Sequence, residues 1–300
     1  MAKMNQREKS LIFVHLAVFL FGFPGVISRL VNLPSFSLTF WRVALASLTL
    51  ALILKLQAEK IPCPLPLPDS WLILATGLLL AFHWTAFFQS IQVSTVATGL
   101  LSYSAFPIFT IFLEPWLLGT RFQRLNLLLA VICFSGLYLL VPEFNFRNTI
   151  FIGVIWGLAS GLSFALLTII NRKLSRHYSS LILAFYQDGL AMFFLLPVFL
   201  VKKFSWPGNL QSWGLILFLG IFCTALAHTF FIRGLKDIEA QVSSLISLLE
   251  PVYGLILAYL ILKEKPDVRT LAGGGFILAS VLWLSWQSAR EAKKAELSRR

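Results

Sequence analysis

Charged residues are scarce in this chain of 300 residues. Asp, Glu, Lys and Arg together make up 13% of the sequence, whereas an average soluble domain contains about 25%. Apolar residues reach 58%. This composition excludes a soluble globular domain and predicts an all-α polytopic membrane protein.

Cysteines and catalytic motifs are also sparse. Cys63 lies in a loop, Cys133 and Cys223 lie in separate apolar runs, and no CxxC spacing occurs, so neither a disulfide framework nor a cysteine metal site is predicted. No histidine has a second ligand four residues away, and no HExxH or GxSxG motif is present. We therefore predict no metal, no cofactor and no enzymatic activity. A membrane-embedded enzyme or a structural membrane protein is the alternative from another class.

The formal net charge of +12 would suggest nucleic-acid binding in a soluble protein. In a membrane protein it is better explained by basic loops on one side of the bilayer. If the N-terminus is cytoplasmic, most of the 25 lysines and arginines fall in segments that face the cytoplasm. We therefore predict that both termini are cytoplasmic and that no nucleic acid is bound.

Long apolar runs dominate what is present. About 20 apolar residues cross the hydrocarbon core of a bilayer, and the linkers between the runs are too short to form a soluble domain. Ten windows of this length are predicted to be transmembrane helices: residues 11–31, 36–56, 70–90, 95–117, 124–142, 149–170, 179–201, 211–231, 240–262 and 269–288.

The chain shows an internal repeat. Pro107 and Pro251 occupy matching places in two apolar windows, and at the same offset Phe87 matches Phe231. Because a five-helix unit has an odd number of crossings, the second copy must be inverted, as in many secondary transporters. We predict a first repeat over 1–144, a second over 145–288 and a basic cytoplasmic tail over 289–300, with both prolines kinking their helices.

Glu250 is the most informative ionisable residue inside a window. It lies about ten residues into its helix, which places it roughly 15 Å deep at 1.5 Å per residue. Ionisable groups at this depth are costly and usually face a cavity or a partner. Pro251 follows it and leaves a nearby carbonyl free. Glu250 is interpreted either as a carboxylate for proton coupling or a substrate amine, or as a hydrogen-bonded structural glutamate at the kink.

A second pair of charges lies in the second and seventh windows. Arg42 follows Phe40-Trp41, and Asp188 follows Tyr186-Gln187 at nearly the same place in the second repeat. Arg42 is interpreted as binding a carboxylate or pairing with Asp188. A structural or interfacial role is the alternative for each.

His83 and His228 lie one position apart in the register of the repeat. If both face one cavity, they can titrate near neutral pH. Neutral histidines hydrogen-bonded between helices are the alternative. His15 is alone on its helix, which favours a structural role. Gly153, Gly157 and Gly161 form a GxxxGxxxG ridge that permits close helix approach.

These residues resemble a known family. The segments Glu250-Pro251, Leu262-Lys-Glu264 and Leu271-Ala-Gly273-Gly resemble EamA-type proteins of the drug/metabolite transporter superfamily, and Phe40-Trp41-Arg42 resembles the arginine early in that family's second helix. The resemblance covers the whole chain, including its ten windows and paired prolines. In this family each repeat resembles the segment at Glu264, with a glutamate in the turn after the proline helix. The corresponding turn of the first repeat, Leu118–Arg121, lacks that glutamate.

The resemblance implies a bacterial inner-membrane carrier, often an exporter of amino acids or related metabolites. In such proteins the pathway is lined mainly by the first, third, fourth, sixth, eighth and ninth helices, which points to His15, His83, Trp84, Tyr103, Trp156, His228, Ser247 and Glu250.

We predict a secondary transporter that moves small amphipathic metabolites by alternating access, either facilitated or proton-coupled. Its partners would be a small-molecule substrate, membrane lipid and, in the coupled case, protons; the oligomeric state is left open. An exchanger of nucleotide sugars or phosphorylated metabolites is the alternative. It would need several basic groups at the midplane, and Arg42 is the one basic residue well inside a window.

Overall fold

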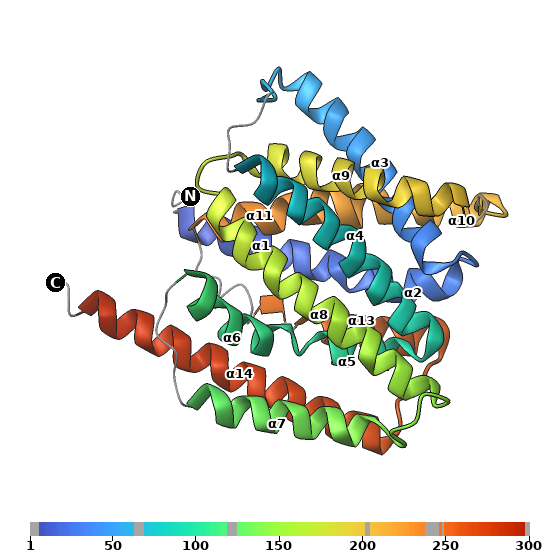
Figure 1. Ribbon diagram of the computed structural model, residues 1–300, viewed down its shortest axis with the longest axis vertical. Helices are drawn as coiled ribbons and strands as arrows, with labels where there is room; N and C mark the ends of the chain where they lie inside the picture. Colours follow the sequence, from blue (N-terminus) through green and yellow to red (C-terminus); the bar gives the residue numbers. More distant parts are fainter. Residues whose placement is uncertain are drawn as a thin grey trace.

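The computed structural model describes residues 6–62, 69–118, 125–201, 205–237, 246–247 and 249–297, and every element assigned in these ranges is a helix (Figure 1). The first predicted repeat contains α1 (Gln6–Phe21), α2 (Phe23–Leu30), α3 (Ser35–Leu56), α4 (Asp69–Val93), α5 (Val96–Tyr103), α6 (Phe106–Leu118) and α7 (Leu125–Leu140). The second, with the tail, contains α8 (Thr149–Leu174), α9 (Ser180–Val201), α10 (Leu210–Gly220), the π-helix η1 (Ile221–Leu226), α11 (Ala227–Asp237), α13 (Leu249–Leu257), the π-helix η2 (Ala258–Leu262) and α14 (Val268–Leu297).

Each of the ten predicted windows coincides with a helix or with consecutive helices, except that residues 240–245 and 248 of the ninth lie outside the described residues. Two shorter apolar helices, Leu127–Leu140 and Leu249–Leu262, fall in the fifth and ninth windows. The predicted helical membrane protein is thereby confirmed, whereas the ten crossings and the inversion of the repeat stay predictions. Seven helical segments are long and apolar enough to cross a membrane: Glu8–Leu30, Ser35–Leu56, Asp69–Val93, Val96–Leu117, Thr149–Leu174, Ser180–Val198 and Leu210–Lys236.

The fourth window is broken into two helices. α5 ends at Tyr103 and α6 begins at Phe106, with a turn between them. Pro107 lies in the first turn of α6, where its missing N–H leaves no helical hydrogen bond unmade. The expected kink is therefore a complete interruption, because the proline ring would clash with the carbonyl of a continuous helix four residues earlier, at Tyr103, where α5 ends. Pro251 lies in the first turn of α13, and the chain before that helix is only partly described.

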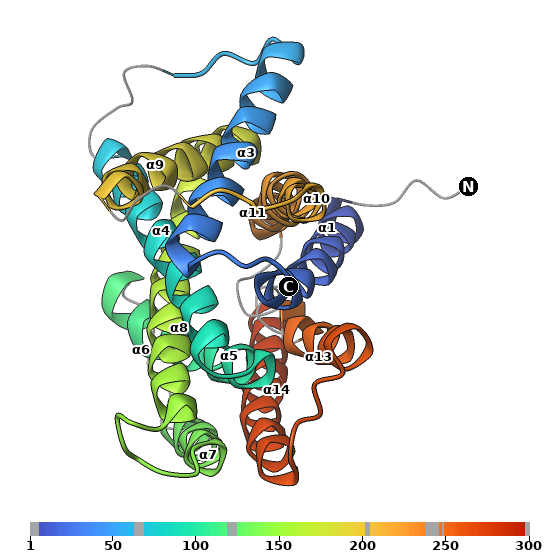
Figure 2. The same cartoon turned by 90° about the vertical axis from the view of Figure 1, so that its right-hand side faces the viewer.

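The main packing contacts join the two predicted repeats. α4 packs along α8, α3 along α9, α1 along α11 and α7 along α14, as Figures 1 and 2 show. Each pair takes one helix from either repeat, so both repeats build the centre of the bundle. α1 begins and α14 ends on the same side of the molecule (Figure 1).

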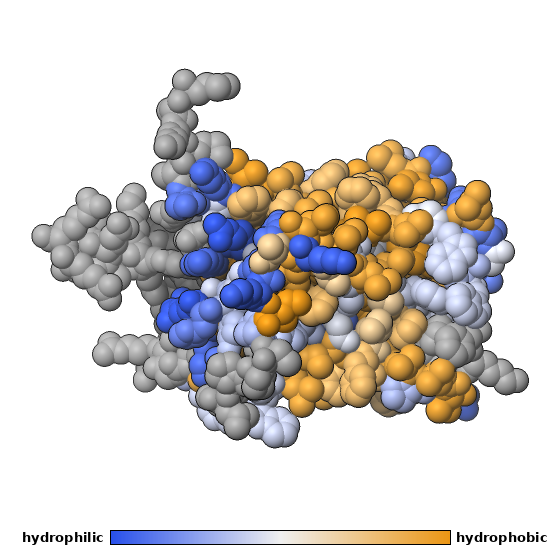
Figure 3. Space-filling view, turned by 90° about the horizontal axis from the view of Figure 1, so that it is seen from above, coloured by the Kyte–Doolittle hydropathy of each residue, from blue (hydrophilic) through white to orange (hydrophobic). Residues whose placement is uncertain are grey.

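The outer surface is apolar over a broad belt. Figure 3 shows this belt on one face, with hydrophilic residues gathered toward its two ends. Large apolar side chains stand out from several helices, such as Leu48 on α3, Val131 on α7 and Phe193 on α9, at 68%, 62% and 65% exposed. A contiguous apolar surface of this kind is stable only against lipid or another protein, so the belt is the membrane-facing surface.

The glycine ridge of α8 brings three helices close together. A Cβ atom added at Gly157 would lie 1.8 Å from Ser102 Oγ on α5, and one added at Gly153 would lie 2.2 Å from Ser94 Oγ just after α4. Ser90 on α4 donates a hydrogen bond to the Gly153 carbonyl. The predicted close approach is therefore present, and it fixes α8 against both α4 and α5.

Candidate functional site

A cavity lies at the centre of the bundle, between helices of both predicted repeats. Its wall is mostly apolar, with many aromatic rings, and also carries charged, imidazole and amide side chains. The free volume is about 30 Å³, which is room for one or two water molecules, so side chains fill most of the cavity in this conformation. The aromatic residues are Phe21, Trp84, Phe87, Tyr103, Phe164 and Phe231, and the polar ones are Arg42, His83, Asn171, His228 and Glu250.

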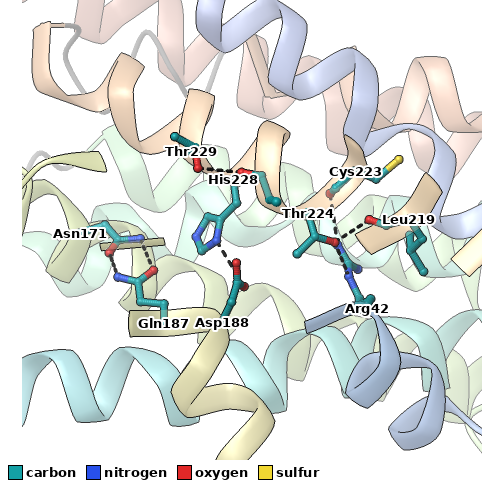
Figure 4. Close-up of polar contacts among 10 residues, drawn as sticks. Arg42, Asn171, Gln187, Asp188, Leu219, Cys223, Thr224, His228 and Thr229 are labelled. Carbon is teal, nitrogen blue, oxygen red and sulfur yellow. Dashed lines mark hydrogen bonds and ion pairs between the residues drawn. The ribbon is translucent and has the colours of Figure 1, made fainter. Parts of the chain in front are cut away.

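Arg42 on α3 is 1% exposed and is held by neutral groups (Figure 4). Its Nε donates to Thr224 Oγ1 at 3.0 Å, and its Nη2 donates to the Cys223 carbonyl at 3.3 Å. The guanidinium carbon lies 3.8 Å from the centre of the Trp84 ring, a cation–π contact. Among the described residues no carboxylate lies within 4.0 Å of this cation. The predicted alternative of a direct ion pair between Arg42 and Asp188 is therefore absent from this structure.

The local fold explains why these groups meet Arg42. Cys223 and Thr224 lie in η1, a π-helical segment between α10 and α11. A π-helix shifts the hydrogen-bond register by one residue and leaves some carbonyls free for other donors, and such segments are frequent at functional sites. Here one carbonyl accepts from the guanidinium, while Thr224 Oγ1 donates to the Leu219 carbonyl at 2.7 Å.

Asp188 on α9 and His228 on α11 form a buried pair. Asp188 Oδ1 lies 3.6 Å from His228 Nδ1, and the two residues are 0% and 4% exposed. Both carboxylate oxygens and both ring nitrogens lack a hydrogen-bond partner. Figure 4 shows the imidazole and the carboxylate turned toward one another. Burying polar atoms without hydrogen bonds is unfavourable for the free energy of folding, so this pair destabilises the folded state.

Beside this pair, two amides satisfy each other. Asn171 on α8 and Gln187 on α9 exchange hydrogen bonds through their side chains, and both residues are buried (Figure 4). Asn171 also lines the cavity. The sequence interpretation missed Asn171, because the predicted window 149–170 ends one residue before this amide.

His83 on α4 has the opposite environment to His228. Its Nδ1 lies 2.8 Å from Ser160 Oγ and 3.0 Å from the Ser160 carbonyl, and the ring stacks on Phe164 with centroids 4.9 Å apart. Ser160 is on α8. His83 is therefore hydrogen-bonded between helices, while His228 is not.

Glu250 on α13 is 6% exposed and lines the cavity. No hydrogen bond or ion pair joins its carboxylate to another described residue. Tyr103, 3% exposed, is on the same wall. The cavity therefore contains a buried carboxylate and a buried guanidinium that do not pair with each other.

Three predicted pathway residues lie elsewhere. His15 is exposed on α1, on the same side as Ile12 and Leu16, whereas the buried face of that helix carries Val14 and Val18. Trp156 is partly buried on α8, away from the cavity. Ser247 is buried but is not part of the cavity wall. Helical rotation explains this, because residues on one helix at other angles face lipid or neighbouring helices.

The predicted outer side of the cavity is closed by polar contacts. Glu264 accepts hydrogen bonds from the backbone N–H groups of Val96 and Ala97 at 3.3 and 3.2 Å, at the start of α5. A carboxylate is favourable there because the helix dipole is positive at that end. Lys263, just before it, adopts a left-handed φ of 58°. Arg29 adds a bond of 2.9 Å to the Ser94 carbonyl.

On the opposite side, the ends of α6 and α8 are joined by an ion pair. Arg172 Nη1 lies 2.6 Å from Glu114 Oε1. The neighbouring loop after α8 is also tied down, because the Tyr178 hydroxyl donates to Asp69 at 3.0 Å. Residues 119–124 and 238–245 lie outside the described residues.

Comparison with known proteins agrees with this architecture. The EamA-like transporter family matches the chain twice, over residues 8–141 and 151–286. An uncharacterized transporter of Archaeoglobus fulgidus is 31% identical over 211 residues, covering 70% of this chain and 73% of that protein. A solved crystal structure with 16% sequence identity covers 94% of this chain and 98% of its own, with a TM-score of 0.69, and so shares the fold.

Two further relatives have named solutes. The pseudopaline exporter CntI of Pseudomonas aeruginosa is 24% identical over 85% of this chain and 87% of its own. The S-adenosylmethionine uptake transporter of Rickettsia prowazekii is 24% identical over 86% of this chain and 85% of its own. The predicted family is confirmed: this chain belongs to the EamA-like transporter family and is an integral membrane transporter rather than an enzyme.

Proposed function

We propose that the protein is a secondary transporter that exports amino acids or related small amphipathic metabolites by alternating access. One observation carries the proposal. The wall of a single cavity presents a buried guanidinium and a buried carboxylate that do not pair with each other, surrounded by aromatic rings.

An amino acid matches this arrangement group by group. Its carboxylate can accept charge-assisted hydrogen bonds from Arg42, and its ammonium can donate to Glu250. Both charges are expensive inside a membrane without a counter-charge, and a bound zwitterion supplies one to each. The rings of Trp84, Phe87 and Phe164 offer an apolar surface to the rest of the solute.

The small volume of the cavity supports alternating access. With about 30 Å³ of free volume, the cavity cannot hold even a small amino acid until its walls separate. The predicted inverted repeat supplies two related halves for such a movement. The break between α5 and α6 and the π-helices η1 and η2 are natural places for helices to bend.

The named relatives support the solute class and leave the direction to be tested. One is named as an exporter and one as an uptake transporter, so net direction varies among proteins of similar sequence. S-adenosylmethionine is by its name an amino-acid derivative. Export is the direction that we assign to this chain.

The test is counterflow in proteoliposomes. Vesicles loaded with each of a panel of unlabelled amino acids receive the labelled compound outside, and saturable entry above that of protein-free vesicles identifies the solute group. Arg42→Gln and Glu250→Gln should abolish counterflow, whereas Arg147→Gln, on an exposed loop, should preserve it. Counterflow of a nucleotide sugar or phosphorylated metabolite in place of amino acids would contradict the proposal. So would full activity of Arg42→Gln.

A further inference from the structure

We infer that the Asp188–His228 pair is the binding site for the proton that drives transport, separate from the charges that hold the solute. This inference rests on the proposed carrier function and adds to it the coupling ion and its site. Glu250, which the sequence analysis also considered for proton coupling, is assigned to binding the solute.

The geometry of the pair fits a ligand as small as a proton. Asp188 is fully buried and lies behind the cavity wall, while His228, 3.6 Å from it, is on the wall. All four polar atoms of the two side chains lack hydrogen-bond partners. No room exists between them for an organic group. A single proton placed between the carboxylate and the imidazole would partner one atom on each side.

A metal cation fits this place poorly. Hard cations such as Na⁺ or Ca²⁺ need several oxygen ligands, and here one carboxylate faces a ring nitrogen. Within the part of the chain that the structure describes, no three His, Cys, Asp or Glu side chains are grouped to hold a metal. The nearby amides of Asn171 and Gln187 are already bonded to each other.

The charged and titratable groups around the pair set its charge balance. α3 contributes Arg42, α4 contributes His83, η1 contributes Cys223, and the cavity wall adds Tyr103 of α5 and Glu250 of α13. From α8 the neutral amide of Asn171 faces the cavity, and on α1 the histidine at position 15 is exposed. Arg42 is thus the permanent cation near the pair.

The proton balance is simple. Without the extra proton the carboxylate is ionised, the imidazole is neutral, and the pair carries one negative charge. Taking up one proton from water forms one N–H or O–H bond and makes the pair neutral overall. Because His228 is on the cavity wall, a proton on its ring adds one positive charge to the wall of the solute cavity.

Two cations repel strongly in a site of low dielectric constant. Proton and ammonium therefore each favour release of the other, and competition of this kind produces antiport. A proton entering from outside would drive an amino acid out, which agrees with export.

The first test separates proton coupling from solute transport itself. In inside-acid proteoliposomes, wild-type protein should accumulate labelled amino acid above its external concentration as protons leave. Asp188→Asn, behind the cavity wall, should lose this accumulation while keeping counterflow, and His228→Gln should also lose the accumulation. His177→Gln, an exposed histidine in a loop, is the matched control and should behave as wild type. Accumulation by Asp188→Asn equal to wild type would overturn the inference, as would wild-type counterflow with no response to the pH gradient.

A second measurement needs no solute, so that it remains decisive if counterflow fails in the wild type and the proposed function falls. The chain contains 4 histidines, whose ¹⁵N imidazole signals in lipid can be assigned by single substitutions. His228 should change its protonation state within the pH range in which the protein stays folded, and this change should be lost in Asp188→Asn. A His228 ring that keeps one state throughout that range in the wild type would overturn the proton site.

Discussion

The two histidines of the central cavity occupy related positions in the predicted repeat but have opposite surroundings. His83 is hydrogen-bonded to Ser160 through both the hydroxyl and the carbonyl, whereas His228 has only an unbonded carboxylate 3.6 Å away. The same side chain is hydrogen-bonded at one position of the predicted repeat and lacks hydrogen bonds at the other. Two matching positions of a predicted repeat can therefore differ in their surroundings.

The helices that carry the two histidines differ in the same way. α4 is one continuous α-helix from Asp69 to Val93. The corresponding segment of the second repeat passes from α10 through η1 to α11. The π-helix gives Arg42 its carbonyl partner and precedes His228 directly. The regular helix holds a fixed histidine, and the irregular one holds the histidine that we assign to the proton.

The largest effect on stability is expected from disturbing the packing of α8, the helix that carries the partner of His83. Gly157→Ala would place a Cβ 1.8 Å from Ser102 Oγ, which forces α8 away from α5. Overpacking of this kind costs about 1–3 kcal/mol of the free energy of unfolding. Because Ser160 is one turn further along α8, its bond to His83 should also loosen. The check is the apparent melting temperature in detergent.

Gly275→Ala on α14 is the matched control, because nothing lies within 4 Å of an added Cβ there. It should leave the melting temperature unchanged or raise it slightly, since alanine favours a helix over glycine. Equal melting temperatures for the two variants would show that α8 is not packed as tightly as the ridge suggests.

A pair of smaller changes should move stability in opposite directions at the two histidines. Ser160→Ala removes a satisfied hydrogen bond from His83 and should destabilise the protein by about 1 kcal/mol. Asp188→Asn replaces an unbonded buried carboxylate with a neutral amide and should stabilise the protein by a comparable amount, about 1 kcal/mol. Thermal unfolding of the two variants beside the wild type measures both. A less stable Asp188→Asn would mean that the carboxylate has a strong partner in the native state.

Much of this fold was predictable from the sequence, because long apolar runs identify membrane helices without knowledge of their neighbours. Arg42, Asp188 and Glu250 were found for the same reason, since ionisable residues in such runs stand out. The difference between His83 and His228 was not predictable. It depends on Ser160 and Asp188, which belong to other helices and are brought close only by packing.

The position of His15 outside the cavity wall has a different physical origin. A resemblance can point to a helix but does not give its rotation, and a turn of one residue changes the face by 100°. The π-helix η1 was likewise invisible, because no proline or glycine marks residues 221–226. Rotation and register are set by packing across the whole bundle, which a single window of sequence does not contain.

The smallest expected effect contrasts the buried Asp188 with an exposed aspartate. Asp267 precedes α14, and its Oδ1 accepts a hydrogen bond from the Thr270 backbone N–H at 2.8 Å. Hydrogen bonds from Thr270 are the main reason that the pKa of Asp267 lies below its usual value. Because the pKa of Asp267 is lower in the folded than in the unfolded protein, its ionised carboxylate stabilises the fold at neutral pH. This stabilisation is lost as the pH falls through the folded pKa.

Asp267→Ala should therefore cost about 0.5–1 kcal/mol at neutral pH, the low end for removing a helix cap, because the site is exposed and screened by solvent. Melting curves of wild type and variant recorded at falling pH should converge in acid, while amino-acid counterflow stays unchanged. A stability difference that persists unchanged at low pH would show that the aspartate acts through packing rather than charge. Asp188→Asn should give the reverse pattern, with altered coupling and no loss of stability, because neither oxygen of its buried carboxylate accepts a hydrogen bond from a described residue.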